Sequence, residues 1–482
     1  MPRIGFSQKT YDMFKGNYIF LKRGNTMNER QQLHVKNIDA HRQLILDAER
    51  WVWAHPQTGF TEWEAHNYLK EKFENLGYSL TMAGNIPGFY TDIDTGKPGP
   101  TLCIMGELDA LDIANHPESV NGMAHSCGHN GQVAALLGIA AALKEPGALD
   151  GLCGVIRLMT VPAEEMIQLE FREGLRKEGI IKYYGGKIEF MARGLFDGVD
   201  IAMMVHGGVA GSDEAWDFSC GVGHNGCIAK TFKYKGKSSH AGAAPHLGVN
   251  AQYAAMLGLQ AVNDLRETFL EKDTIRFHPV MMGANVAVNI IPDEVKVESF
   301  VRSRSLEAMK RENEKINRAL TGGALAIGAG LELCDRPGYS PEYHDPDFMK
   351  LTEECCIDLV GADRVDFDYN AWSTGSSDFG DLTTVMPGVQ FRAAGPIGTA
   401  HGIDYYVADP NRLCVNAAKA QLLVTEALLE NEAKSAKEII ANYKPVYPSI
   451  KDYFEALDDL ILDKDAVKYD ARGNATVDYL NN

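Results

Sequence analysis

The stretch Thr101-Leu-Cys-Ile-Met-Gly-Glu-Leu-Asp109 joins a short apolar run to two acidic residues, Glu107 and Asp109. Three more apolar, β-rich runs follow along the chain, at 154–161, 200–205 and 389–393. Segments of helical length separate these runs, and such alternation is typical of a parallel sheet wrapped by helices. The sequence therefore predicts the α/β class, with a mostly parallel twisted sheet and flanking helices.

Potential ligands follow each of the later runs. Glu164 and Glu165 come directly after the second run, His206 follows the third, and His401 follows the fourth after a Gly-Pro-Ile-Gly loop. In open α/β sheets, sites form in the crevice beyond the carboxyl ends of the strands. We therefore expect these side chains to share one edge of the sheet.

A thiol and an imidazole stand two residues apart in His125-Ser-Cys-Gly-His-Asn130, just before an Ala- and Leu-rich helical stretch. A helix amino terminus stabilises a thiolate, and a metal lowers its pKa further. Taken alone, Cys127 is more often an inert buried cysteine, and His129 carries little weight. Likewise the two glutamates alone suggest a solvated loop, and His206 or His401 a hydrogen-bonded loop residue.

Five such groups at one edge together indicate metal binding. Their mixture of S, N and O donors exceeds what one tetrahedral zinc uses, so two metal ions are implied, and these would activate a bridging water. Glu164 and Glu165 are neighbours, so they point to different sides of an extended segment, and one can bind metal while the other carries protons. Asp109 would accept a hydrogen bond from a ligand imidazole, or simply end a strand.

The order of elements changes between 218 and 336, where a β-α-β-β-α-β pattern predicts an inserted α+β sandwich with helices on one sheet face. Two helices joined by a turn are expected over 28–78. The expected organisation is an N-terminal tail, a catalytic domain in two parts, the inserted domain and a charged, helix-prone C-terminal extension, at 1–27, 28–217 with 337–431, 218–336 and 432–482.

Composition narrows the classes of partner. The chain has 482 residues and a formal net charge of −18, which argues against nucleic acid or an anionic membrane and favours a small molecule. Nine scattered cysteines without a Cys-x-x-Cys motif suggest a reducing, cytoplasmic location. The first 26 residues contain no apolar run suited to a signal peptide or a membrane span.

At these residues the sequence resembles the dinuclear metallohydrolases of aminoacylase and carboxypeptidase type, nearest the branch of indole-3-acetyl-amino acid hydrolases and aminobenzoyl-glutamate hydrolase subunits. The matching pieces are Gly106–Leu111, His125–Asn130, Pro162–Glu165, Ser238–Ala241, Asn289–Asp293 and Gly375–Phe379. The resemblance implies that the general base is Glu164, that Asp109 orients the site, and that the metal ligands are Cys127, His129, Glu165, His206 and His401.

In that family the inserted domain is a lid that also forms a homodimer. The resemblance implies that His240 stabilises the oxyanion, while Asn289 and Arg302 hold the substrate; His246 is a weaker candidate. Arg302 suits a carboxylate because its planar fork makes two parallel hydrogen bonds. The metals would be zinc or manganese, with nickel also open.

Several residues depart from the family pattern: Glu107, Asn130, Gln132, Ser377 and a long segment at 166–193. The predicted function is hydrolysis of a small N-acyl or N-aroyl amino acid, such as an aminobenzoyl-glutamate-like amide. The alternatives are hydrolytic deamination of an aromatic amine at the same site, and a non-catalytic metal-binding or assembly protein.

Overall fold

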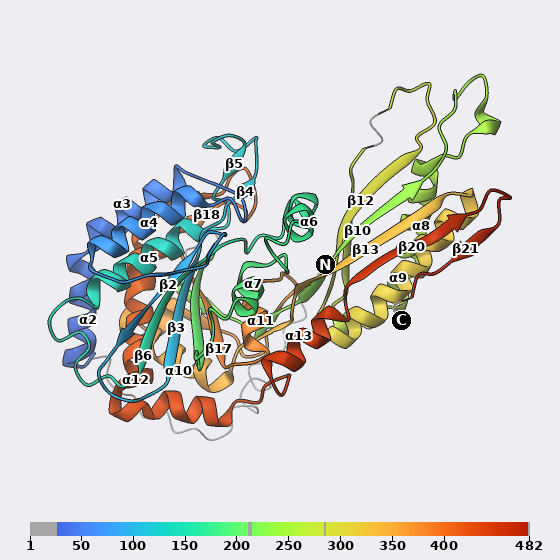
Figure 1. Cartoon of the computed structure of the whole chain (residues 1–482). Helices are drawn as coiled ribbons and strands as arrows, with labels where there is room; N and C mark the ends of the chain where they lie inside the picture. Colours follow the sequence, from blue (N-terminus) through green and yellow to red (C-terminus); the bar gives the residue numbers. More distant parts are fainter. Residues whose placement is uncertain (1–26, 211–214, 284–285, 481–482) are drawn as a thin grey trace, which may run out of the picture.

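A computed structural model describes residues 27–210, 215–283 and 286–480. These residues form two lobes, each built on its own sheet (Figure 1). Apart from Met27, the expected N-terminal tail lies outside the described residues.

The first lobe is organised around a sheet of eight strands among the described residues. In spatial order they are β1 (Thr81–Met82), β2 (Phe89–Asp94), β6 (Val155–Val161), β3 (Thr101–Glu107), β7 (Ile201–Gly207), β17 (Gly388–Ala393), β8 (Phe218–Cys220) and β15 (Val365–Phe367). The central strands β6, β3, β7 and β17 are parallel to one another. They are the four runs predicted from the sequence, so the α/β prediction is confirmed.

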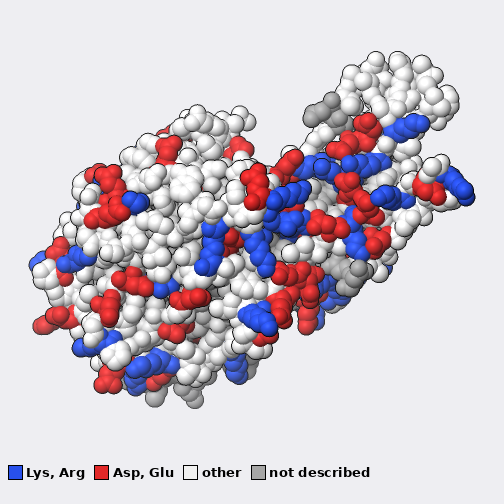
Figure 2. Space-filling model, in the orientation of Figure 1, with Lys and Arg blue, Asp and Glu red and all other residues white. Residues whose placement is uncertain are grey.

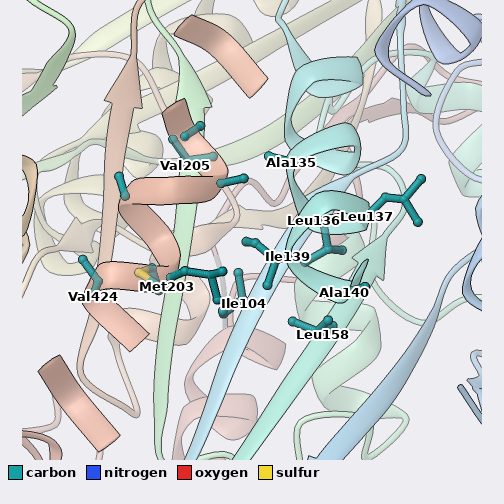
Figure 3. Packing of buried hydrophobic residues seen from close by; sticks show 14 of the residues in the cluster. Ile104, Ala135, Leu136, Leu137, Ile139, Ala140, Leu158, Met203, Val205 and Val424 are labelled. Atoms are coloured by element: carbon teal, nitrogen blue, oxygen red, sulfur yellow. The ribbon is translucent and has the colours of Figure 1, made fainter. Parts of the chain in front are cut away.

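Helix α5 (His129–Ala142) forms the centre of this lobe, and every one of its side chains is buried. It packs between the sheet strands β3 and β7 on one side and helices α3 (Arg42–Trp53) and α12 (Ala417–Asn442) on the other. Ile139 of α5, Ile104 of β3 and Met203 of β7 meet in this core (Figure 3). A helix that is apolar on all sides is stable only when it is enclosed in this way.

The other helices of this lobe cover the sheet and its edges. They are α2 (Glu29–Ala40), α4 (Trp63–Asn75), α6 (Leu169–Lys177), α7 (Gly186–Ala192), α10 (Pro346–Val360), α11 (Phe379–Thr383) and the π-helical turn η5 (Asn411–Asn416). The expectation of two helices over 28–78 was wrong, because the first helical stretch breaks at His41 and yields both α2 and α3. Short strand pairs complete the lobe: β4 (Leu111–Asp112) with β5 (Met123–Ala124), and β18 (Pro396–Ile397) with β19 (Tyr406–Val407).

The second lobe is an antiparallel sheet covered on one face by α8 (Ala251–Asp264) and α9 (Leu306–Ile327). Its strands, in spatial order, are β11 (Arg276–Met281), β12 (Glu294–Ser303), β10 (Gly226–Lys235), β13 (Gly330–Tyr339), β20 (Leu462–Tyr469) and β21 (Ala475–Val477). Buried and accessible residues alternate along β12, as expected for a sheet with one covered face. The predicted α+β insertion is confirmed.

The C-terminal extension differs from its prediction. It does contain helix α13 (Ile450–Asp458), but from Leu462 onwards the expectation of helix was wrong. Strand β20 pairs with β13 and places Leu462, Ala466 and Val467 in the core of the second lobe. The charged residues of this segment prevent its recognition as a strand from the sequence. Its apolar residues gain packing partners only when the strand pairs with β13.

All nine cysteines lie within the described residues, and none of them forms a disulfide. No helix within this part of the chain is long and apolar enough to cross a bilayer.

Candidate metal centre

The carboxyl edge of the first sheet collects the predicted ligands. Glu165 follows β6, His206 lies at the end of β7, and His401 lies in the loop after β17. Gly128 caps α5 with a φ of +90°, and a Cβ there would meet the Tyr405 hydroxyl at 2.7 Å. Only glycine therefore fits between Cys127 and the first helical residue, His129.

The structure brings all five predicted ligands together in two groups of three that share Cys127. One group is Cys127, His129 and His206, and the other is Cys127, Glu165 and His401. Cys127 Sγ lies 3.4 Å from His206 Nε2, and His401 Nε2 lies 3.1 Å from Glu165 Oε1. His129 and Glu165 are buried, whereas His401 is exposed at the mouth of the site.

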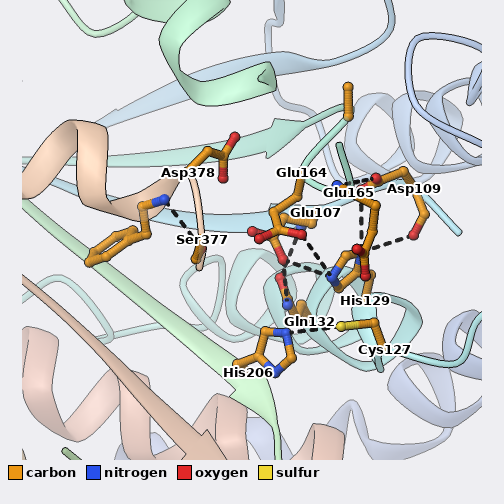
Figure 4. A network of polar contacts seen from close by, with 12 residues as sticks. Glu107, Asp109, Cys127, His129, Gln132, Glu164, Glu165, His206, Ser377 and Asp378 are labelled. Atoms are coloured by element: carbon orange, nitrogen blue, oxygen red, sulfur yellow. Dashed lines mark hydrogen bonds and ion pairs between the residues drawn. The ribbon is translucent and has the colours of Figure 1, made fainter. Parts of the chain in front are cut away.

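Two imidazoles are held through Nδ1, so that His206 Nε2 faces the Cys127 thiol and His129 Nε2 faces the carboxylates of Glu107 and Glu164 (Figure 4). His129 Nδ1 lies 2.9 Å from the Asp109 carbonyl and 3.2 Å from its Oδ1, so this nitrogen donates. His206 Nδ1 donates to the Gly207 carbonyl at 2.7 Å. With Nδ1 protonated, each Nε2 presents a lone pair to the cluster, which is the arrangement found in metal-ligating histidines.

Two buried ligand atoms in the cluster make no hydrogen bond, namely His129 Nε2 and Glu165 Oε1. Their near neighbours are themselves metal-ligating groups, Glu107 Oε2 at 3.2 Å and His401 Nε2 at 3.1 Å. Burial by itself would raise the pKa of Cys127, but the facing imidazoles of His206 and His129 hold it well below its usual value. A thiolate, imidazole lone pairs and a carboxylate are ligands that fit divalent transition metals.

Glu164 lies beside this ligand set, and one of its carboxylate oxygens lies within 4.8 Å of a carboxylate oxygen of Glu165, so the two side chains converge instead of pointing to different sides as expected. Its Oε2 is 4.0 Å from His129 Nε2. Burial, and then the nearby carboxylates of Glu107 and Glu165, raise its pKa well above the usual value. A carboxyl with this environment is suited to carrying a proton during a reaction.

An inward lysine was missed by the sequence reasoning. The Lys187 ammonium is fully buried and contacts Glu107 Oε1 and Asp378 Oδ1. Glu107 in turn accepts from Gln132 Nε2 at 2.7 Å and lies 3.2 Å from His129 Nε2. The departures at Glu107 and Gln132 therefore belong to one connected network (Figure 4). The available signal was a lone lysine among apolar residues in the long 166–193 segment.

The same segment supports the backbone that carries the two glutamates. Arg172 is buried and donates to the carbonyls of Ala163, Tyr184 and Glu165. Ala163 has a φ of 59°, a conformation that costs a residue with a side chain about 1 kcal/mol or more. Its N–H donates to Glu62 Oε1 at 2.7 Å. These bonds hold the turn that carries Glu164 and Glu165 into the site.

The three predicted substrate residues are in the second lobe. His240 Nδ1 accepts from the N–H groups of Gly242 and Ala243, and the Asn289 carbonyl accepts from Ala241. Their segments, 236–250 and 286–293, reach the free end of that lobe, away from the first sheet (Figure 1). Arg302 lies nearer the junction, where it donates to Ser376 Oγ at 3.3 Å. In this arrangement the structure brings His240 and Asn289 together, but apart from the five ligands.

An α/β lobe that carries a metal-type donor set, joined to an α+β lobe, defines the class of protein. The sequence profile of peptidase family M20/M25/M40 matches residues 103–425, and the chain belongs to this family. It is therefore a hydrolase of the M20 type.

Individual relatives are distant. The chain is 27% identical to one of the p-aminobenzoyl-glutamate hydrolase subunits of Escherichia coli over 61% of this chain and 58% of that protein, so the match spans little more than half of that relative. It is 27% identical to human Xaa-Arg dipeptidase over 76% of this chain and 81% of that protein. It is 25% identical to indole-3-acetyl-aspartic acid hydrolase of Enterobacter agglomerans over 72% and 86%.

A solved structure shares the fold. It is that of Bacillus subtilis YXEP, described as a dinuclear metal binding peptidase from the M20 family, with a TM-score of 0.59 and 19% identity over 83% of this chain and 99% of that one. The fold prediction is thus confirmed by comparison as well as by the sheets themselves.

Proposed function

We propose that this protein is a two-metal amidohydrolase that cleaves a small N-acyl or N-aroyl amino acid. The observation that carries the proposal is the pair of three-residue groups that share Cys127. The names of the relatives support the substrate class, because they include hydrolases of aminobenzoyl-glutamate and of an indole-acetyl amino acid.

In this proposal the metals would be held by Cys127 together with His129 and His206 in one group, and by Cys127 together with Glu165 and His401 in the other. Two divalent cations there would supply an activated water and polarise the amide oxygen. Zinc suits the thiolate, while manganese and nickel accept the same nitrogen and oxygen donors. Asp109 orients His129 through the Nδ1 contact described above.

Glu164 is the general base in this mechanism. It takes a proton from the attacking water and delivers it to the amide nitrogen as the amine leaves. Its elevated pKa favours holding that proton between the two steps. Tyr339 steadies the residue by donating its hydroxyl hydrogen to the Glu164 carbonyl.

Substrate recognition is assigned to the second lobe acting as a lid. Arg302 would bind the carboxylate of the amino acid, Asn289 would hold the substrate, and His240 would donate to the developing oxyanion. Because His240 and Asn289 stand away from the cluster here, these roles require closure of the lid or a contribution from a second copy of the chain.

We also propose a homodimer through the second lobe. Exposed apolar side chains gather on α8 and beside the edge strand β11, namely Tyr253, Met256, Leu257, Val280 and Met282. The free end of the lobe shows almost no charged residue on the face in Figure 2. Such a surface is typical of a contact between protomers. Free cysteines throughout fit a reducing, cytoplasmic setting.

The test is the variant Glu164→Gln, assayed on a panel of acyl-amino acids, dipeptides and aminobenzoyl-glutamate. We expect kcat/KM to fall by about 10²–10⁴-fold while two metals per chain are retained, because the ligands are intact. Glu170→Gln, at an exposed glutamate of the same region, is the matched control and should keep full activity. Undiminished turnover by Glu164→Gln would refute the assignment.

A further inference from the structure

A second mixed cluster of metal-ligating side chains lies where the chain passes between the lobes. His224 is in β9 (Gly223–His224), which joins the first sheet to β10. Glu342 and His344 are at and after β14 (Glu342–Tyr343), on the return from β13 to α10. The two strands pair antiparallel with Glu342 opposite His224, and β16 (Trp372–Ser373) extends the pair. We name these three residues the crossover cluster.

The ligand atoms of the crossover cluster converge. His224 Nδ1 lies 3.0 Å from Glu342 Oε2, and His344 Nε2 contacts Glu342 Oε1. Glu342 and His344 are buried, and the His224 side chain is only 14% exposed. His224 Nδ1 and Glu342 Oε2 are both buried atoms without a hydrogen bond, although they face one another. Their separation is close to the roughly 3.3 Å between neighbouring ligands of a tetrahedral zinc ion.

The tautomer of His344 follows from its surroundings. His344 Nδ1 lies 2.7 Å from the Gly221 carbonyl, which can only accept, so Nδ1 carries a hydrogen. With Nδ1 directed to that carbonyl, His344 turns Nε2 toward a carboxylate oxygen of Glu342, and a proton or a cation must lie between these two atoms.

Within the part of the chain that the structure describes, the ligand set consists of these three residues. Cys220 Sγ faces His344 Nδ1 at 3.4 Å, on the side away from Glu342, and cannot join the same ion. Arg392 Nη2 lies 3.2 Å from His224 Nε2. That arginine is exposed, so its side chain can turn away when His224 Nε2 takes the proton required for binding through Nδ1.

We propose that His224, Glu342 and His344 form a third metal site, distinct from the hydrolytic centre and suited to Zn²⁺. Two imidazoles and a carboxylate give three protein ligands, with a fourth position open to water. A metal there ties the outgoing and returning crossings to each other. Its role is structural, because it stiffens the junction about which the second lobe would move relative to the first.

The test uses the full chain, stripped with a chelator and reloaded with ZnCl₂ alone. Anomalous diffraction at the zinc edge is expected to show a peak between His224 Nδ1, Glu342 and His344 Nε2, and metal analysis of dialysed protein to give one equivalent more than the hydrolytic centre holds. A cluster without a peak in crystals equilibrated with 1 mM ZnCl₂ (roughly a thousandfold above a micromolar Kd) would overturn the proposal. This test requires only the wild-type protein.

Variants separate this site from the hydrolytic one. His344→Gln and, independently, His224→Asn should each lose the crossover peak and the extra equivalent, and should show a smaller rise in Tm on zinc addition than the wild type. The peaks at Cys127 should remain, so failure of either site is read independently of the other. Zinc stabilisation and stoichiometry that are unchanged in both variants would contradict the proposal.

Discussion

Replacing Lys187 by Met should destabilise the protein strongly, because it removes the cation that lies between two buried carboxylates. Lys187, Glu107 and Asp378 are all fully buried, so water cannot compensate the charges that remain. Breaking a buried ion pair by deleting one partner costs about 3–5 kcal/mol. For 482 residues the unfolding entropy is roughly 1 kcal/mol per kelvin, so a cooperative transition should shift by about 3–5 °C.

The measurement is a thermal melt followed by circular dichroism, with Lys182→Met as control. Lys182 lies in the same segment, but its pair with Asp458 is about half exposed, so its loss should cost less than about 1 kcal/mol. Adding Glu107→Gln and Asp378→Asn to Lys187→Met should recover much of the loss, since no charge is then left unpaired. Equal melting of the Lys187 and Lys182 variants would refute the reasoning.

Three further outcomes are expected. Burial raises the pKa of Asp381 to about 7, so between about pH 4 and 7 the folded chain keeps a proton that the unfolded chain loses. The free energy of unfolding therefore falls as pH rises through this window. Asp381→Asn should flatten that slope in urea titrations at pH 5 and 8, and an unchanged slope would contradict this prediction. Deleting 460–482 removes β20, which exposes the edge of β13 and the apolar core that β20 helps to cover. Tm should therefore fall and light scattering should rise, and an unaltered melt would count against the packing role of β20. Cys127→Ser should weaken both metal positions while His401→Ala weakens one, and identical metal contents in the two variants would exclude the shared-thiolate arrangement.

Much of the first lobe could be predicted from local pattern. Apolar runs of strand length mark β3, β6, β7 and β17, and polar ligands directly after them identify the functional edge. The five ligands were predicted because metal-binding residue types follow the strands at one sheet edge and lie in motifs that resemble a known family. The roles of these ligands and the domain bounds remain predictions. Because β8 at Phe218–Cys220 belongs to the first sheet, the chain passes into the second lobe nearer Gly226 than residue 218.

Other features could not be predicted from the sequence, because they depend on contacts with residues far away in the chain. Lys187 resembles a surface lysine until Glu107 and Asp378 are placed around it. Strand β20 resembles part of a charged helix until β13 supplies a sheet edge. His224 and His344 lie 120 residues apart and share no motif, so only the paired crossings bring them to one carboxylate.

Short segments of the chain already specify the kind of chemistry and the sheet edge that bears it, since ligand types and apolar periodicity are local properties. Packing between distant segments was needed to settle which charges are paired in the interior, which strand closes the second sheet, and how the histidines direct their nitrogens. Those features depend on burial and on the angle between groups, and neither exists until the chain has folded.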